Sequence, residues 1–141
     1  MCQKNGNRVI PWAILGWGKL TGKYSKENPG NHPTTTSHLP QTFDDKDWRI
    51  LEVLKTVAQK HECAIGNVTL AWALAKLDVP SVLMGCRTLE QLRENVKAME
   101  VELDETDLME LDQASCFDLG FPHTFLGGTT SQVSSKLELT V

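Results

Sequence analysis

Apolar residues recur at helical spacing in four segments of this chain. A first helix is predicted from Asp44 to about His61, with one apolar stripe along it. A second helix, with Asn67 as its N-cap, is apolar nearly all round, which predicts burial on several sides. The stripe of the first helix is Ile50, Leu54, Val57 and His61, flanked by Leu51 and Ala58, and the second helix contains Val68, Leu70, Ala71, Trp72, Leu74 and Ala75.

Two further helices are predicted in the second half of the chain. One opens at Thr88, because Thr88 and Gln91 have the spacing of a capping box. The other starts near Asp104. The third helix has a single apolar face of Leu89, Leu92, Val96 and Met99, and the fourth has an inward stripe of Leu108, Leu111 and Ala114.

Two short apolar runs predict buried strands, Val9-Ile10 before Pro11 and the run from Val79 to Met84 before Gly85. The order of strand, loop, two helices, strand and two helices favours an α/β fold with a parallel sheet. Two strands for four helices is an unusual balance for a self-contained domain. Residues 25–41 predict a loop or lid, and the Ser/Thr-rich C-terminal tail is expected to fray.

Composition excludes several classes of function. The chain has 141 residues, of which 40% are hydrophobic and 23% charged, with a formal net charge of -4. Nucleic acid is therefore not an expected partner, since phosphate binding needs a basic face. No apolar run approaches the roughly 20 residues that span a membrane, and residues 1–5 lack the apolar stretch of a secretory signal. Four scattered cysteines are typical of reduced thiols in a cytoplasmic protein.

Familiar catalytic and metal-binding motifs are missing from the sequence. There is no HExxH, paired-cysteine or EF-hand pattern, so a metal site is not expected. There is no GxSxG nucleophile elbow either. The length is also too short for a complete (β/α)8 barrel, which needs about 250 residues.

The glycine-rich segment from Gly16 to Tyr24 matches neither common phosphate-binding pattern. The GxGxxG fingerprint would need glycine where Thr21 stands, and a P-loop would need Ser or Thr after Lys23. A glycine loop that follows a strand still lets backbone N–H groups approach a phosphate. Phosphate contact and a purely structural loop both remain open from these residues alone.

A second candidate site begins where the predicted strand ends at Gly85 and a capped helix follows Arg87. Helix N-termini attract anions, and an arginine adds a planar fork that suits a phosphate. Gln91 and Asn95 lie four residues apart on one helix face, within reach of a ligand at the helix start. In the alternative, Gln91 only closes the cap and Asn95 is solvated.

Taken together, these segments resemble the C-terminal half of an aldo-keto reductase over roughly residues 1–127. Residues 11–24, PWAILGWGKLTGKY, look like the family's P-W/Y-S-P-L-x-x-G-x-L-T-G-K-Y. Residues 82–95, VLMGCRTLEQLREN, are similar to the family's V-I-x-G-x-R-x-x-E-Q-L-x-E-N. The ending FDLGFPHTFLG, residues 117–127, resembles the fungal aryl-alcohol dehydrogenase-like branch.

The resemblance implies part of a (β/α)8 barrel, about its last three βα units and terminal helix in residues 1–127, followed by a flexible tail at 128–141. The parent family uses NADPH to reduce aldehydes or ketones. The resemblance places Trp12 on the nicotinamide, Ala13, Leu15, Gly16 and Gly18 along the pyrophosphate, Lys23 and Tyr24 over it, and Gly85, Arg87, Gln91, Glu94 and Asn95 around the adenosine and its 2′-phosphate.

The catalytic residues of the family are not recognisable here. Its Asp, Tyr, Lys and His set belongs to the first half of the barrel, and the only tyrosine present, Tyr24, lies in the cofactor segment. We therefore expect a truncated reductase chain that binds NADP(H) but cannot reduce a small carbonyl substrate unless another chain supplies the proton donor. The alternatives are a non-catalytic module that binds a nucleotide or a partner, self-association through an exposed barrel edge included, and a degenerate product that folds poorly.

Overall fold

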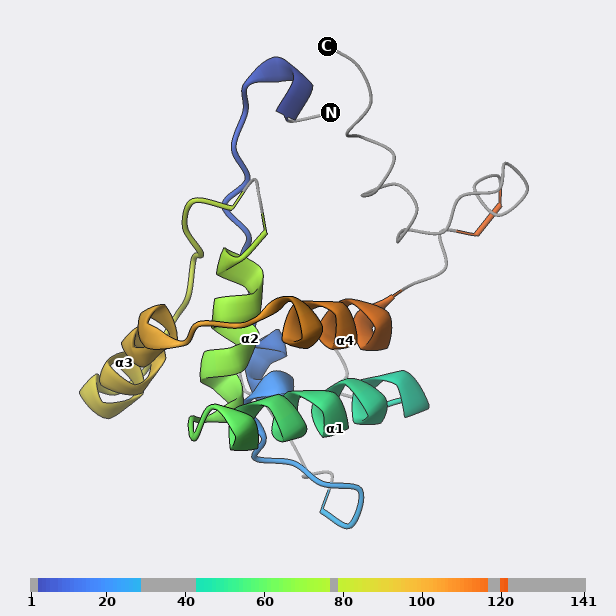
Figure 1. The fold of residues 1–141 in the computed structure, drawn as a ribbon. Helices are drawn as coiled ribbons and strands as arrows, with labels where there is room; N and C mark the ends of the chain where they lie inside the picture. Colours follow the sequence, from blue (N-terminus) through green and yellow to red (C-terminus); the bar gives the residue numbers. More distant parts are fainter. Residues whose placement is uncertain (1–2, 29–42, 77–78, 117–119, 122–141) are drawn as a thin grey trace.

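The structure, a computed structural model, describes residues 3–28, 43–76, 79–116 and 120–121. Helix α1 packs against both α2 and α4, while α2 also contacts α3 and the two short helices η2 and η3 (Figure 1). The predicted tail at 128–141 and most of the predicted loop at 25–41 lie outside the described residues. In chain order the elements are η1 (Gln3–Asn5), η2 (Gly16–Thr21), α1 (Asp45–Lys60), α2 (Ile65–Leu74), α3 (Leu89–Val96), η3 (Lys97–Glu100) and α4 (Glu105–Ser115).

Helices α1 and α4 both begin with an aspartate capping box. The Asp47 N–H donates to Asp44 at 2.8 Å, and the Asp44 N–H donates back to the Asp47 carboxylate at 3.1 Å. Asp104 and Asp107 repeat the arrangement at the start of α4, at 2.9 and 3.2 Å. Such reciprocal bonds satisfy two amides that the first helical turn leaves unpaired. The predicted helix starts at Asp44 and Asp104 are confirmed, and α1 ends at His61 as expected.

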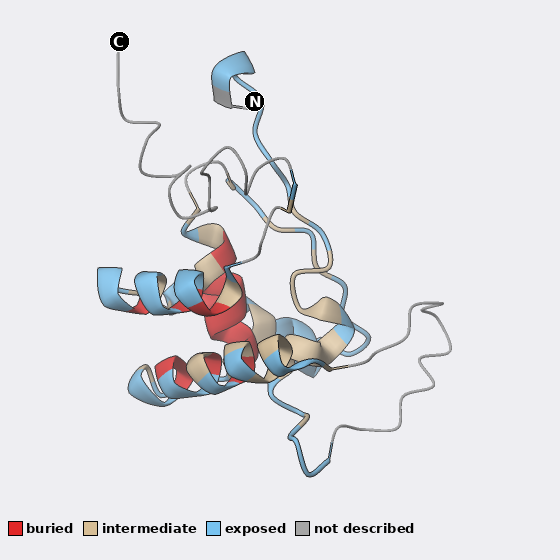
Figure 2. Ribbon diagram, turned by 90° about the vertical axis from the view of Figure 1, so that its right-hand side faces the viewer, coloured by how far each residue is buried: buried red, intermediate tan, exposed pale blue. Residues whose placement is uncertain are grey.

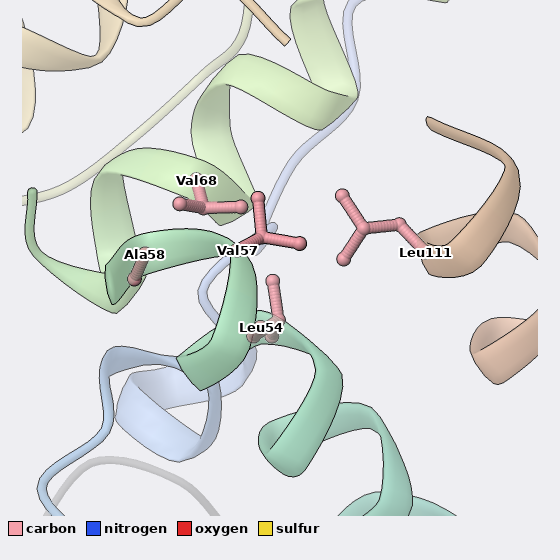
Figure 3. Packing of buried hydrophobic residues seen from close by; sticks show 5 residues of the cluster. All are labelled: Leu54, Val57, Ala58, Val68 and Leu111. Carbon is pink, nitrogen blue, oxygen red and sulfur yellow. The ribbon is translucent and has the colours of Figure 1, made fainter. Parts of the chain in front are cut away.

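The core lies where α1, α2 and α4 meet. Leu54, Val57 and Ala58 of α1 pack with Val68 of α2 and Leu111 of α4 (Figure 3). None of these five residues is more than 4% exposed. Buried positions concentrate on α2 and on the sides of α1 and α4 that face it (Figure 2). The apolar stripes predicted for α1 and α4 and the burial of the second helix on several sides are confirmed, although Ala75, predicted in that helix, is its exposed C-cap.

The start of α2 differs from the prediction. The helix begins at Ile65 with Ala64 as its N-cap, so Asn67 is a buried residue of the first turn rather than the cap. The reason is packing across the chain. Ile65 lies directly against Gly22, and Thr69 donates a hydrogen bond to the Leu20 carbonyl at 3.1 Å, so these contacts extend the helix toward its N-terminus.

The two predicted strands are reduced to a single parallel bridge between Trp12 and Leu83. The Leu83 N–H donates to the Pro11 carbonyl at 2.9 Å, and the described residues contain no longer strand. Val9 and Ile10, predicted to be buried, are 39% and 62% exposed. A parallel strand needs neighbours at its edges and cover on both faces, and each segment here has one neighbour at one position. The bridge does keep the parallel direction that an α/β fold requires.

Helix α3 starts as predicted, because the Gln91 N–H donates to the Thr88 hydroxyl at 3.2 Å. The α-helix ends at Val96, so Met99, predicted on its apolar face, belongs to η3 instead, and the predicted face stays largely exposed. The exposed fractions along this face are 55% for Leu89, 40% for Leu92, 48% for Val96 and 79% for Met99. Among the described helices, none is long and apolar enough to cross a membrane.

Candidate functional site

Both candidate motifs follow the two backbone segments that the parallel bridge joins. The glycine-rich segment comes directly after Trp12, and the segment with Arg87 comes after Leu83. Loops that follow neighbouring parallel segments leave from the same edge of the pair. The structure therefore brings the starts of the two motifs together. In the sequence, 70 residues lie between Trp12 and Leu83, which is more than any local pattern spans.

The glycine-rich segment is a series of tight turns. Gly16 has a φ of +54°, Gly18 of +96° and Gly22 of +78°, all in the left-handed region that suits glycine. The Gly16 N–H donates to the Ala13 carbonyl at 2.8 Å, and the Gly18 N–H donates to Leu15 at 2.9 Å. These two amides hold the turns in shape, so a phosphate at this segment needs other donors.

Lys23 places a positive charge over this segment. A Cβ at Gly18 would lie only 2.6 Å from the Lys23 ammonium, so the ammonium rests directly on the Gly18 backbone. The same ammonium lies 4.9 Å from the centroid of the Tyr24 ring. A larger residue at position 18 would displace the end of the lysine side chain, and the left-handed backbone there favours glycine. A cation at the turn is what a bound phosphate group would require.

Aromatic rings flank the glycine-rich segment on two sides. Trp12 is 68% exposed and meets Trp17 edge to face, with 5.7 Å between ring centroids. Tyr24 meets the Phe43 ring at 5.4 Å, and Phe43 stacks on Trp48 of α1 at 4.4 Å. Trp12 thus keeps a surface on which a planar ring can stack, whereas Tyr24 is held toward α1.

The turn before α3 presents Arg87 at the surface. The Arg87 N–H donates to the Gln91 side-chain oxygen at 2.8 Å, while the Gln91 N–H binds Thr88. A Cβ at Gly85 would meet nothing within 4 Å. The oxygen of Gln91 is therefore used to shape the turn, and the open space beside Gly85 and Arg87 is accessible to a ligand.

Glu94 and Asn95 lie one turn further along α3. Glu94 forms an ion pair with Lys97 at 2.6 Å, and Asn95 is half-buried. Glu94 faces a cleft beside the first turn of α2, and neither Arg87 nor Gln91 lines that cleft. Of the predicted adenosine residues, Gln91, Glu94 and Asn95 lie on α3, whereas Gly85 and Arg87 lie in the turn before it, and the structure does not gather all of them at one point.

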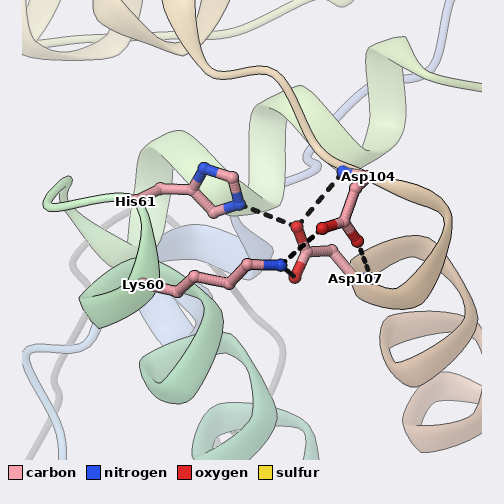
Figure 4. A network of polar contacts seen from close by, with 4 residues as sticks. All are labelled: Lys60, His61, Asp104 and Asp107. Atoms are coloured by element: carbon pink, nitrogen blue, oxygen red, sulfur yellow. Dashed lines mark hydrogen bonds and ion pairs between the residues drawn. The ribbon is translucent and has the colours of Figure 1, made fainter.

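A polar network centred on the buried Asp107, which the sequence did not reveal, joins α1 to α4. Lys60 contacts Asp104 at 2.6 Å and Asp107 at 2.8 Å, and His61 Nε2 lies 2.7 Å from Asp107 (Figure 4). The Asp107 side chain is only 3% exposed. The basic C-terminal end of α1 contacts the acidic N-terminal start of α4. More than 40 residues separate the partners in the sequence, so no local spacing indicates the contact.

Ionisation in this network is set by its hydrogen bonds. Burial alone would raise the pKa of Asp107, but hydrogen bonds from Lys60 and His61 outweigh it, and the pKa lies below its usual value. The Lys60 hydrogen bond likewise lowers the pKa of Asp104, and both carboxylates raise the pKa of Lys60. Lys60, Asp104 and Asp107 therefore stay charged at neutral pH, and their contacts connect two helices, which is a structural role.

The close contact of Gly22 with α2 predicts a marked effect of adding one methyl group there. A Cβ at Gly22 would lie 2.5 Å from Ile65 Cδ1, at a φ of +78°. We expect Gly22→Ala to lower the free energy of unfolding by about 1–3 kcal/mol, from strain and overpacking. Urea unfolding measures the change. Gly85→Ala, in open space, should stay within about 0.5 kcal/mol of the parent; an equal effect of both substitutions would contradict the close contact.

Comparisons with known proteins point in one direction. The model of the Aldo/keto reductase family matches residues 1–115. An aryl-alcohol dehydrogenase from Pestalotiopsis microspora is 32% identical, covering 90% of this chain and 32% of that relative. Norsolorinic acid reductase B from Dothistroma septosporum is 35% identical, covering 92% of this chain and 32% of its own length. The chain therefore spans about a third of the length of these relatives.

Two further matches differ in how much of the relative is covered. A putative aryl-alcohol dehydrogenase from Saccharomyces cerevisiae is 27% identical over 90% of this chain, which spans 86% of that relative. A solved thermostable aldo-keto reductase, in complex with the inhibitor epalrestat, superposes with a TM-score of 0.56 at 27% identity. That superposition covers 81% of this chain and 32% of the solved one.

Proposed function

The chain belongs to the aldo/keto reductase family, and from that premise we propose that it forms the NADP(H)-binding portion of an aryl-alcohol dehydrogenase-like oxidoreductase. The corresponding part of the fold would be about the last three βα units and terminal helix of a (β/α)8 barrel. The observation that carries the proposal is the parallel bridge between Trp12 and Leu83, because it starts the two cofactor motifs from one edge. A cytoplasmic location is part of the same proposal, supported by the thiols of Cys63 and Cys86, which form no disulfide in the described part of the chain.

The residues present fit a phosphate-bearing cofactor. Lys23 holds its ammonium over the turn at Gly18, and Arg87 stands beside open space at Gly85. In the proposal Lys23 faces the pyrophosphate and Arg87 the 2′-phosphate, since a planar guanidinium matches phosphate geometry. The pyrophosphate would run along Ala13, Leu15, Gly16 and Gly18, and the adenosine along Gln91, Glu94 and Asn95.

Trp12 has the clearest role in positioning the reactive end of the cofactor. Its indole is 68% exposed and is steadied by the edge of Trp17. In the proposal the exposed face stacks on the nicotinamide and fixes which ring face is open to the substrate. When bound, the cofactor supplies the hydride for reducing a small carbonyl compound.

Proton transfer is the part of the reaction that these residues do not provide in our proposal. The only tyrosine of the chain, Tyr24, packs against Phe43 beside the Lys23 ammonium. We assign it to closing the cofactor segment rather than to donating a proton. Reduction of a carbonyl needs a general acid, tuned by a nearby lysine or histidine. The 141 residues are therefore expected to bind NADP(H) without robust turnover of an aromatic aldehyde.

Cofactor binding can be tested by titrating the chain with NADPH and following tryptophan fluorescence. Saturable quenching is expected, because the proposal stacks the nicotinamide on Trp12. Arg87→Ala should weaken NADPH binding by about tenfold or more, the scale of one charged hydrogen bond, while NADH binding stays nearly unchanged.

Arg93→Ala is the matched control, because Arg93 is an exposed arginine on α3, the helix that follows Arg87, and it should leave both affinities unchanged. An absence of quenching at millimolar NADPH would overturn the proposal. An equal loss of NADPH and NADH affinity in Arg87→Ala would remove the role given to its guanidinium. Robust aldehyde turnover by the purified chain would contradict the assignment of proton transfer to other residues.

A second candidate function, a non-catalytic module that binds a partner or a second copy, is favoured by one observation. The apolar face formed by Leu89, Leu92 and Val96 of α3 and by Met99 of η3 is exposed, and the Trp12–Leu83 bridge has no further described strand beside it. Apolar faces and open strand edges promote association. Sedimentation velocity across a range of protein concentrations distinguishes a self-associating chain from a monomer.

A further inference from the structure

A cleft separate from the glycine-rich segment lies where the turn between α1 and α2 faces α3 and η3. Its volume is about 630 Å³, within the roughly 300–1,000 Å³ of small-molecule sites. It shares only Glu94 with the residues proposed to bind the cofactor. The side chains that matter here are His61, Asn67, Glu94, Lys97, Glu100 and Glu102.

Asn67 gives this cleft an unused polar group in its wall. The residue is 2% exposed, and its backbone N–H donates to the Ala64 carbonyl at 2.9 Å. Its side-chain amide makes no hydrogen bond with any residue in the described part of the chain. Buried amides almost always have a partner, in the protein, in water or in a ligand. The amide of Asn67, with both donors and an acceptor, is therefore available to a bound molecule.

The charge around the cleft selects the kind of molecule. Glu62, Glu94, Glu100 and Glu102 line it, and Lys97 is the one lysine or arginine among its lining residues. Lys97 is already held by Glu94 at 2.6 Å, a hydrogen bond that raises the pKa of Lys97. Uncompensated carboxylates therefore remain at the rim, and they favour a cation over an anion.

The remaining polar side chains add no charge that would change this preference. Burial and the nearby Glu94 carboxylate raise the pKa of the Cys63 thiol, so it stays neutral. His61 directs Nε2 to Asp107 at 2.7 Å. In the described residues, no group of three or more His, Cys, Asp or Glu side chains is placed to hold a metal ion. An organic cation with N–H donors matches both the carboxylates and the amide.

We propose that this cleft binds a small organic cation that carries an ammonium or guanidinium group. One N–H of the ligand would donate to the Asn67 side-chain oxygen. The positive charge would face Glu100 and Glu102, both of which are exposed at the rim. The site shares only Glu94 with the proposed NADP(H) site, and Asn67, Glu100 and Glu102 belong to this cleft alone, so either proposal can fail while the other holds.

The test is a titration of the isotope-labelled 141-residue chain with agmatine, which carries both cationic groups, followed by NMR. We expect a saturable shift of the Asn67 side-chain amide resonances, and none with the neutral diol 1,5-pentanediol. Asn67→Leu should weaken agmatine binding by about tenfold, the loss of a hydrogen bond to a charged group. Replacing both rim carboxylates, Glu100→Gln with Glu102→Gln, should weaken it by about threefold or more.

Glu110→Gln is the matched control, because it removes one exposed carboxylate on α4 away from the cleft and should leave the agmatine affinity unchanged. The rim variant keeps the test decisive if Asn67→Leu does not fold. Unshifted Asn67 amide resonances at saturating agmatine would overturn the proposal. Equal weakening by Glu110→Gln and by the rim variant would also overturn it, since attraction would then come from overall charge.

Discussion

Replacing Asp107 by alanine is expected to lower the free energy of unfolding by about 3 kcal/mol, the sum of the lost side-chain half of the α4 capping box and the lost charged hydrogen bonds to α1. The Asp107 carboxylate is buried and accepts from Lys60, from His61 and from the Asp104 N–H. The substitution therefore removes the capping box of α4 and its polar connection to α1 together. Urea unfolding near neutral pH, followed by circular dichroism, measures the loss.

The acid side of the stability curve provides an independent check on Asp107. Its pKa is lower in the folded chain than in the unfolded chain, so its stabilising effect is complete above the unfolded pKa of about 3.9. That effect is lost as the pH falls through the folded pKa. Asp107→Ala should therefore flatten the acid limb below about pH 4.

Glu110→Ala, exposed on the same helix, serves as the control and should change stability by less than about 0.5 kcal/mol. If Asp107→Ala were no more destabilising than this control, the network would contribute nothing to holding α4 in place.

Replacing Leu111 by alanine should cost about 3 kcal/mol, within the range of about 2–5 kcal/mol for buried leucines. Leu111 is 3% exposed and is the residue of α4 that enters the core cluster with Leu54 and Val57. Its removal leaves a cavity between α1 and α4 that the surrounding helices can fill only in part. Thermal and urea unfolding both report the loss.

Met109→Ala is the matched control for this experiment, since Met109 lies on the same helix but is 58% exposed. It should stay within about 0.5 kcal/mol of the parent chain. Similar losses for the two substitutions would show that α4 is not docked through Leu111.

The helix starts could be predicted from the sequence because their chemistry is local. At Asp44, Thr88 and Asp104 the side chain bonds an amide three residues later, so the signal lies within one turn. The start of α2 was missed for the opposite reason. Contacts of Ile65 and Thr69 with a segment more than 40 residues away decide it, and no local pattern contains them.

The strands and the candidate site show the same contrast between local features, which the sequence predicts, and long-range contacts, which it does not. Val9 and Ile10 have the composition of a strand, but a strand forms only against neighbours, and one bridge at Trp12 is what the described residues supply. The parallel direction of the two segments was predicted from the order of strands and helices, and it places the starts of the two motifs side by side. The hydrogen bond from the Arg87 N–H to the Gln91 side chain could not be predicted, because the spacing of Gln91 is equally compatible with closing the helix cap and with reaching a ligand.

Helix α2 is shared by the glycine-rich segment and the core. Thr69 bonds Leu20 at 3.1 Å on one side, while Val68, the residue before it, is fully buried against α1 and α4 on the other. Ordering of the glycine-rich segment is therefore thermodynamically linked to folding of the helices. A ligand that binds only the ordered segment therefore stabilises the whole chain by mass action. Conversely, a substitution that destabilises the core weakens the affinity for that ligand without contacting the ligand.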